Sequence, residues 1–171
     1  MAIVVETGTG SATANSYASI AQADAYIALR LFTGWSNLQD HHKEAALVSA
    51  TDYIEAAYRE AWQGYRVTST QALSWPRSNV VVDTFPIDAN VVPTAVVNAC
   101  IEMAYRSSQG SVLIEDQGQL VVREKVDVIE TEYAQFSDPA QKYPFVSKML
   151  APYLLSANAG GSFSQVRTIR T

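Results

Sequence analysis

The sequence predicts a mainly α protein, a small bundle of four to five helices with a β-hairpin or ribbon and extended N- and C-terminal arms. Three observations predict this fold class. Apolar residues recur at helical spacing over 19–32, 40–58 and 93–108. The stretch 120–133 is instead alternating and rich in β-branched residues. Both ends of the chain are rich in glycine and small polar residues, which are typical of extended segments.

Length and composition favour a single domain over 1–171. The chain has 171 residues and 48% hydrophobic residues, which is ordinary for one soluble domain. We expect an extended arm at 1–16, a helical core at 19–155 and a flexible tail at 156–171. Because no apolar run approaches the roughly 18 residues of a membrane span, and no basic segment leads into an apolar one, we expect a cytoplasmic protein.

The charge balance is acidic, with a net charge of -5 and a pI near 4.9. Affinity for phosphate backbones comes largely from lysine and arginine, so this balance opposes loose binding to nucleic acid. Any nucleic-acid role therefore requires a local basic patch.

The first helix is predicted from Ser19 onward. Ser19 and Gln22 form a Ser-x-x-Gln capping box, which is a typical helix start. The apolar positions that follow at helical spacing before Gly34 are Ile20, Ala23, Ile27 and Leu31.

The second helix has the clearest pattern in the chain, with Asp40 as its predicted N-cap. One broad apolar face is formed by Ala46, Leu47, Ala50, Tyr53, Ile54, Ala57 and Tyr58. The opposite, solvated face carries Lys43, Glu44, Ser49, Asp52, Glu55 and Arg59.

Two further helices follow. Pro93 suits a first helical turn, and the helix that it starts runs to about Ser108. Its wide apolar stripe predicts the central helix of the bundle; the stripe contains Val96, Val97, Cys100, Ile101, Ala104 and Tyr105. Tyr143 and Pro144 introduce the last amphipathic helix.

The alternating stretch 120–133 predicts a strand or a pair of strands. A lone two-stranded ribbon is marginal in water, so it must lie on the helices or on a neighbouring subunit. We expect a subunit interface, with Val122, Lys125, Val126 and Val128 as its contact residues.

The C-terminal tail is the least globular segment. Gly160 and Gly161 form a hinge, and no acidic residue follows them. Two interpretations stay open: a frayed terminus, or a strand that adds to another chain's sheet edge through Arg167, Ile169 and Arg170.

Catalytic and metal-binding patterns are not evident, so we expect no enzyme activity, no cofactor and no metal. No nucleophile or phosphate-loop motif occurs. The single cysteine, Cys100, lies in an apolar run and is expected to be buried. His41 and His42 are adjacent and point apart on a helix, and the strand carboxylates Glu130 and Glu132 are expected to face solvent.

One stretch, 58–77, combines aromatic and basic residues. It contains Tyr58, Trp62, Tyr65 and Trp75 together with Arg59, Arg66 and Arg77. Pro76 pushes the residue before it towards an extended conformation, which predicts a chain corner. Three interpretations stay open: core closure, with Trp62, Trp75 and Pro76 as the core corner; a protein interface; or a surface that grips single-stranded nucleic acid.

Several segments in a fixed order carry a family resemblance. They are ANSYASIAQADAYIALR, KEAALVSATDYIEAAY, TQALSWPRSNV, VPTAVVNACIEMAYRS and EKVDVIETEYA. Together they resemble a family of tailed-bacteriophage proteins that are labelled DnaT-like single-stranded DNA-binding proteins, and that look like head-tail connector or adaptor proteins.

The connector interpretation of this resemblance implies a structural virion protein at the neck, made in the host cytoplasm. Its implied partners are the portal protein, a tail terminator, tail or head-completion protein, and further copies of itself in a ring of twelve subunits. Duplex DNA would pass through the ring without specific binding, and Arg77 would lead into a subunit or portal contact. The alternative implied by the same resemblance is a single-stranded DNA-binding protein of phage replication.

Overall fold

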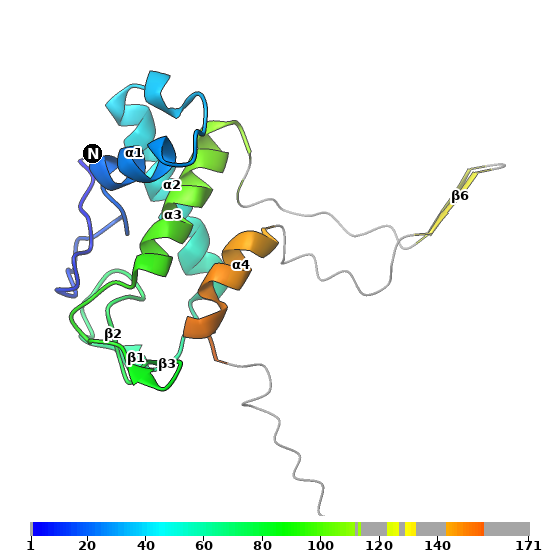
Figure 1. Cartoon of the computed structure of the whole chain (residues 1–171). Helices are drawn as coiled ribbons and strands as arrows, with labels where there is room; N and C mark the ends of the chain where they lie inside the picture. Colours follow the sequence, from blue (N-terminus) through cyan, green and yellow to red (C-terminus); the bar gives the residue numbers. More distant parts are fainter. Residues whose placement is uncertain (1, 112, 114–122, 127–128, 133–142, 156–171) are drawn as a thin grey trace, which may run out of the picture.

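The computed structural model describes residues 2–111, 113, 123–126, 129–132 and 143–155 (Figure 1). In chain order its elements are α1 (Ile20–Ala28), the 3-10 turn η1 (Trp35–Asn37), α2 (Asp40–Tyr58), β1 (Tyr65–Arg66), β2 (Arg77–Ser78), β3 (Val81–Val82), β4 (Phe85–Pro86), α3 (Thr94–Ser108), β5 (Arg123–Val126), β6 (Ile129–Glu132), α4 (Pro144–Leu150) and the 3-10 turn η2 (Ala151–Tyr153). Within these ranges, no helix combines the length and apolar character that a membrane crossing requires.

Helices α2 and α3 lie side by side in opposite directions at the centre of the molecule (Figure 1). The residues that α2 and α3 bury in the core include Ala46, Leu47, Ala50, Ile54, Val96, Ala99, Ile101, Met103 and Ala104. Cys100 is fully buried, as predicted, with its Sγ 3.4 Å from Thr51 Oγ1. Because α3 also packs against α1 and α4, the prediction of a central third helix is confirmed.

Helix α1 begins as predicted and ends earlier. The Ser19 side chain accepts from the Gln22 amide, and the Gln22 side chain accepts from the Ser19 amide, which confirms the capping box. The helix ends at Ala28 rather than at residue 32. Leu31 therefore lies outside the buried helical face on which the spacing placed it.

Helix α2 differs from its prediction in two details. Gln39 is its N-cap, and Asp40 is its first residue. Lys43, predicted on the solvated face, is buried, and its Nζ donates to Asp24 Oδ1 over 2.8 Å. A buried ammonium requires such a partner, because its desolvation is otherwise costly.

The N-terminal segment is folded back rather than extended. The buried Glu6 carboxylate accepts backbone hydrogen bonds from Gly8, Thr9, Gly10 and Ser11, with donor–acceptor distances between 2.7 and 3.1 Å. Val5 forms a parallel bridge with Ser16. The prediction of an extended N-terminal arm is therefore wrong, because one carboxylate satisfies the backbone of the glycine-rich loop internally.

Two pairs of very short strands follow α2. β1 pairs with β2, placing Tyr65 opposite Ser78, and β3 pairs with β4, placing Val82 opposite Phe85. Gly64 precedes β1 with φ 64°, and a Cβ there would lie 2.0 Å from the Ser78 carbonyl oxygen. This close approach explains why glycine stands at the turn.

These strands overturn the predicted fold class. The described residues contain four α-helices and three two-stranded antiparallel sheets, so the protein is mixed α/β rather than a mainly α helical bundle. The missed strands contain two residues each, which is too short for the alternation over 4–8 residues that identifies a strand in a sequence.

The third pair, β5 with β6, confirms strands within 120–133, with Val126 opposite Ile129. Lys125 and Val126 lie in β5, whereas Val122 and Val128 lie outside the described residues. Their role at an interface stays a prediction. The C-terminal tail at 156–171, with Arg167, Ile169 and Arg170, also lies outside the described residues.

Helix α4 begins at Pro144 as predicted. It packs against α3, and Ser147 Oγ lies 2.7 Å from the Tyr58 hydroxyl. The chain then passes through η2 to a bridge between Trp62 and Leu154. The last described residues thereby close the same end of the molecule that carries β1 to β4 (Figure 1).

Candidate functional site

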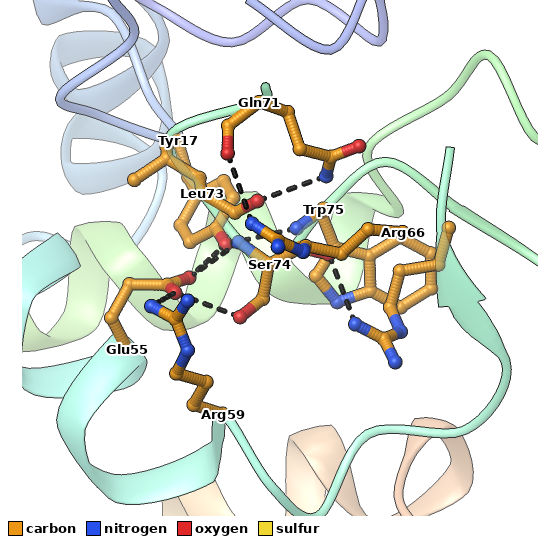
Figure 2. Close-up of polar contacts among 9 residues, drawn as sticks. Tyr17, Glu55, Arg59, Arg66, Gln71, Leu73, Ser74 and Trp75 are labelled. Carbon is orange, nitrogen blue, oxygen red and sulfur yellow. Dashed lines mark hydrogen bonds and ion pairs between the residues drawn. The ribbon is translucent and has the colours of Figure 1, made fainter. Parts of the chain in front are cut away.

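The segment 71–77, here called the Trp-Pro corner, is held by one carboxylate on α2. Glu55 accepts from the Ser74 amide over 3.0 Å, from the Ser74 hydroxyl over 2.7 Å and from the Tyr17 hydroxyl (Figure 2). The Tyr17 oxygen in turn accepts from the Trp75 amide over 3.2 Å. Burial, followed by the nearby Glu55 charge, raises the pKa of Tyr17 well above its usual value. The phenol therefore stays a hydrogen-bond donor, and the corner is fixed to both α2 and the N-terminal segment.

Gln71 organises the other side of the corner. Its side-chain amide donates to the carbonyl oxygens of Leu73 and Pro76 over 2.9 and 3.0 Å. Its side-chain oxygen accepts from the Thr68 amide. The backbone carbonyl oxygen of Gln71 accepts from Arg66 Nη1 over 3.1 Å (Figure 2). Side chains thus form hydrogen bonds to backbone groups of this loop, which has no regular secondary structure.

Arg77 lies inside the corner rather than on its surface. Its guanidinium donates to the carbonyl oxygens of Gln63, Ser74 and Gly64 over 2.6, 3.2 and 2.7 Å. The residue is 8% exposed, and this burial lowers its pKa from the usual value. With its donors directed to three carbonyl groups, Arg77 is occupied within the fold, which is the arrangement expected for core closure.

Both tryptophans of the stretch 58–77 are buried. Trp62 and Trp75 meet edge to face at a centroid distance of 5.7 Å, and Trp75 meets Tyr153 in the same way at 5.9 Å. Pro76 is buried beside them, after a cis Trp75–Pro76 peptide bond. The indole N–H groups of both tryptophans lack a hydrogen-bond acceptor among the described residues. Because these two rings are buried, they are not accessible to a ligand.

A different set of side chains forms the exposed part of this end. Tyr65 is 59% exposed and Phe85 is 70% exposed. Val67 and Val81 are exposed as well. We name this set of four residues the hairpin surface. The β1–β2 and β3–β4 pairs that carry it are neighbours, since the Val81 amide donates to Gln63 Oε1 over 3.3 Å. Figure 1 shows β1, β2 and β3 together at one end of the molecule.

Two arginines lie at the edge of the Trp-Pro corner. Arg59 is half-exposed, and its nearest acidic oxygen, Glu55 Oε2, is 3.9 Å away. Arg66 is partly exposed next to Tyr65 in the sequence. The acidic residues Glu60 and Asp83 are exposed in the same part of the chain, so the local charge is mixed. The arrangement offers aromatic rings for stacking and a small number of cations for phosphate groups.

The residues of the stretch 58–77 that were proposed from the sequence fall into a buried group and an exposed group. Trp62, Trp75, Pro76 and Arg77 are brought together inside the corner, whereas Tyr65 is exposed. Phe85 was not proposed. Its signal was available in VVDTFP, where two residues separate two apolar pairs, a spacing typical of a two-residue hairpin.

The described residues contain no candidate metal site that could contribute to this surface. No group of three or more His, Cys, Asp or Glu side chains that could hold a metal occurs in the described part of the chain. His41 and His42 are both exposed at the start of α2.

Fold and surface together define a small mixed α/β protein with exposed aromatic rings at its strand-bearing end. Residues 1–171 match one protein family over their whole length, and the chain belongs to this family, described as "Putative DnaT-like ssDNA binding protein". No curated protein and no solved structure matches the chain.

The family match corrects the expected role in a virion. The family is described by single-stranded DNA binding, and nothing in the match supports a head-tail connector. The expected portal and tail partners, the twelve-subunit ring and the passage of duplex DNA without specific binding are therefore wrong. The resemblance is confirmed at the level of the family, and its connector interpretation is wrong.

Proposed function

We propose that this protein binds single-stranded DNA through the hairpin surface, with bases stacked on Tyr65 and Phe85. The observation that carries the proposal is the exposure of two aromatic rings on neighbouring strand pairs, with Arg66 next to Tyr65 in β1 and Arg59 exposed at the end of α2. The family description supports the same ligand. The role is one of binding, without a catalytic step.

The two rings are held on rigid backbone. Tyr65 lies in β1, whose approach to β2 depends on Gly64. Phe85 follows the two-residue turn Asp83–Thr84, in which both residues have positive φ. Because the backbone is already ordered, stacking a base orders little more than the ring itself, and less conformational entropy is lost on binding.

Single strands suit this surface better than duplexes do. Base faces are available for stacking only where they are not already stacked in a helix, and such stacking tolerates any base. The net charge of -5 and the small number of nearby cations predict modest affinity with a shallow salt dependence. For two phosphate contacts on a single strand, the slope of log K against log salt is about -1.4.

The test is fluorescence anisotropy of a labelled oligothymidine strand, titrated with the full chain at several salt concentrations. We expect Tyr65→Ala and Phe85→Ala each to weaken binding by about 1–3 kcal/mol, which is roughly 5- to 150-fold. Phe145→Ala is the matched control, because Phe145 is also an exposed aromatic residue but lies on α4. It should leave the affinity unchanged.

Two results would count against the proposal. One is the absence of oligonucleotide binding at low salt. The other is binding that survives both substitutions at the hairpin surface. Arg59→Gln tests the electrostatic part separately, because the exposed Arg59 side chain makes only a long contact within the fold. It should reduce the salt slope without changing the thermal stability.

A further inference from the structure

The last described residues lie close to the hairpin surface. Leu155 ends the described part of the chain, and its amide donates to the Ala61 carbonyl oxygen over 2.6 Å. Leu154, the residue before it, forms an antiparallel bridge with Trp62. The four backbone steps from Ala61 to Tyr65 span at most about 15 Å, so Leu155 lies within roughly 20 Å of Tyr65. The chain therefore leaves the described structure near one ring of the proposed DNA-binding site.

Gln63 fixes this position of the chain end. Its side-chain Nε2 donates to the carbonyl oxygens of Pro152 and Leu154 over 2.9 and 3.3 Å. Its side-chain Oε1 accepts from the Val81 amide in β3 over 3.3 Å, and its backbone carbonyl oxygen accepts from the buried Arg77. One residue thus joins the end of the described chain to the strands of the hairpin surface. Figure 1 shows the chain after α4 ending next to β3.

The C-terminal tail that follows is a basic segment of an acidic chain. Residues 156–171 contain Arg167 and Arg170 and no Asp or Glu. The net charge of the whole chain is -5, so the other residues together carry -7. The two positive charges of the tail are therefore separated in the sequence from the acidic remainder, and they follow directly after the point that Gln63 holds.

The hairpin surface needs cations beyond those that the described fold supplies. A strand bound there carries one phosphate per nucleotide, and affinity for phosphates comes largely from lysine and arginine. Arg59 and Arg66 are partly or fully exposed at this end, but Glu60 and Asp83 are exposed in the same part of the chain. Arg77 is occupied by three carbonyl groups. The fold thus offers rings for bases and little net positive charge for phosphates.

We propose that the C-terminal tail supplies these cations, with Arg167 and Arg170 contacting phosphates of the strand whose bases stack on the hairpin surface. This inference rests on the proposed function and gives it a second contact region. Each residue spans at most about 3.3–3.6 Å, so Arg167 can reach points as far as about 40 Å from Leu155, which is beyond Tyr65. Because the tail is tethered at this surface, its arginines are at a high effective concentration for a strand bound there.

The two contact regions respond differently to salt. Stacking of bases on the hairpin surface involves no counterion release, whereas each phosphate contact on a single strand contributes about -0.7 to the slope of log K against log salt. Two contacts from the fold and two from the tail therefore give a slope of about -2.8. The salt slope counts the arginines that contact the strand, and it separates the tail from the rings.

The test is anisotropy titration of a labelled oligothymidine strand with the full chain, compared with the double variant Arg167→Gln and Arg170→Gln. Glutamine keeps a long polar side chain and removes the charge. The double substitution should change the slope from about -2.8 to about -1.4, and it should weaken binding on the order of tenfold at about 0.1 M salt. Thermal unfolding of each variant checks that the fold is retained.

A matched control removes the same charge from other parts of the chain. Arg30, just after α1, and Lys148, on α4, are both exposed. Arg30→Gln combined with Lys148→Gln should leave the slope at about -2.8, since these positions are not part of the proposed contact region. Tyr65→Ala should weaken binding and leave the slope unchanged, because the ring carries no charge.

The failures of the two proposals are distinguishable. Binding that depends on Tyr65 and Phe85, with a slope that the tail variant does not change, would retain the proposed function and overturn this inference. Equal loss of slope in the tail variant and in the control would overturn it too, because net charge alone then sets the affinity. Tighter binding by the tail variant would show that the tail competes with DNA, which also overturns it. Binding that ignores both ring substitutions overturns the proposed function itself.

Discussion

Arg77 shows how a charged residue in an aromatic and basic stretch can serve the fold alone. Its guanidinium holds two carbonyl groups directly before β1, those of Gln63 and Gly64, and one in the Trp-Pro corner, that of Ser74. Each carbonyl accepts a charge-assisted hydrogen bond, which is stronger than a neutral one. The planar, forked donor arrangement is specific to arginine.

We therefore expect Arg77→Lys to lower the free energy of unfolding by about 2–4 kcal/mol, because one ammonium cannot reach all three buried carbonyl groups. Urea denaturation measures the effect. Arg59→Lys, at an exposed arginine, is the matched control and should change the stability by less than about 0.5 kcal/mol. A stable Arg77→Lys variant would show that the three bonds are weak or replaceable.

At the scale of elements, the β3–β4 turn is built from residues that rarely adopt its conformation. Asp83 and Thr84 have φ values of 51° and 72°. A two-residue hairpin turn with both φ values positive strongly prefers Asn-Gly, and a β-branched threonine is the less suited of the two residues. The turn nevertheless fixes the position of Phe85, which is exposed on β4.

Replacing Asp83 and Thr84 by Asn and Gly should raise the free energy of unfolding by about 1 kcal/mol, since the strain at the turn is relieved. Thermal and urea unfolding measure the gain. Asp88→Asn with Ala89→Gly is the control in the nearby loop, where φ is not positive, and it should give no gain. Equal effects of the two double substitutions would contradict the assignment of strain to the turn.

The helices were predictable and the short strands were not, for a physical reason. The apolar faces of α2 and α3 extend over several turns, so their period of 3.6 is repeated often enough to identify them. The strands β1 to β4 depend on turn residues and on hydrogen bonds between residues 14 and 18 positions apart, namely Arg77 with Gln63 and Val81 with Gln63. A strand of only two residues has no local sequence pattern that reveals these longer-range contacts.

At the scale of the whole molecule, burial of ionisable groups makes the free energy of unfolding depend on pH in the alkaline range. Burial raises the pKa of Cys100 to about 11 from 9.0, and it raises the pKa of Tyr17 well above 10.0. Both groups are neutral when protonated. The folded state therefore keeps these protons at pH values where the unfolded chain releases them.

We expect the free energy of unfolding to be independent of these groups below about pH 8 and to fall as pH rises through 9 to 11. Urea denaturation at a series of pH values measures this decline. Cys100→Ala should flatten the part of the decline that begins near pH 9, and should leave the part caused by Tyr17, above pH 10. A stability that does not change up to pH 11 would contradict the raised pKa values.

The candidate site was only partly predictable at this scale. The stretch 58–77 was identified by its composition, yet the fold turns Trp62, Trp75 and Arg77 inward and leaves Tyr65 outside. Phe85 joins Tyr65 from a separate hairpin. Composition shows which side chains are suited to stacking, but only the packing around Glu55 and Gln71 decides which of them face solvent.

The burial of the tryptophans also determines which part of the molecule the ultraviolet fluorescence of the protein comes from. All three tryptophans of the sequence, Trp35, Trp62 and Trp75, are at most 2% exposed. Two of them are in mutual contact. Ultraviolet emission from this chain therefore originates in its interior and responds to loss of packing. The aromatic residues of the hairpin surface are Tyr65 and Phe85, so a ligand stacked on them is nearly invisible at tryptophan wavelengths.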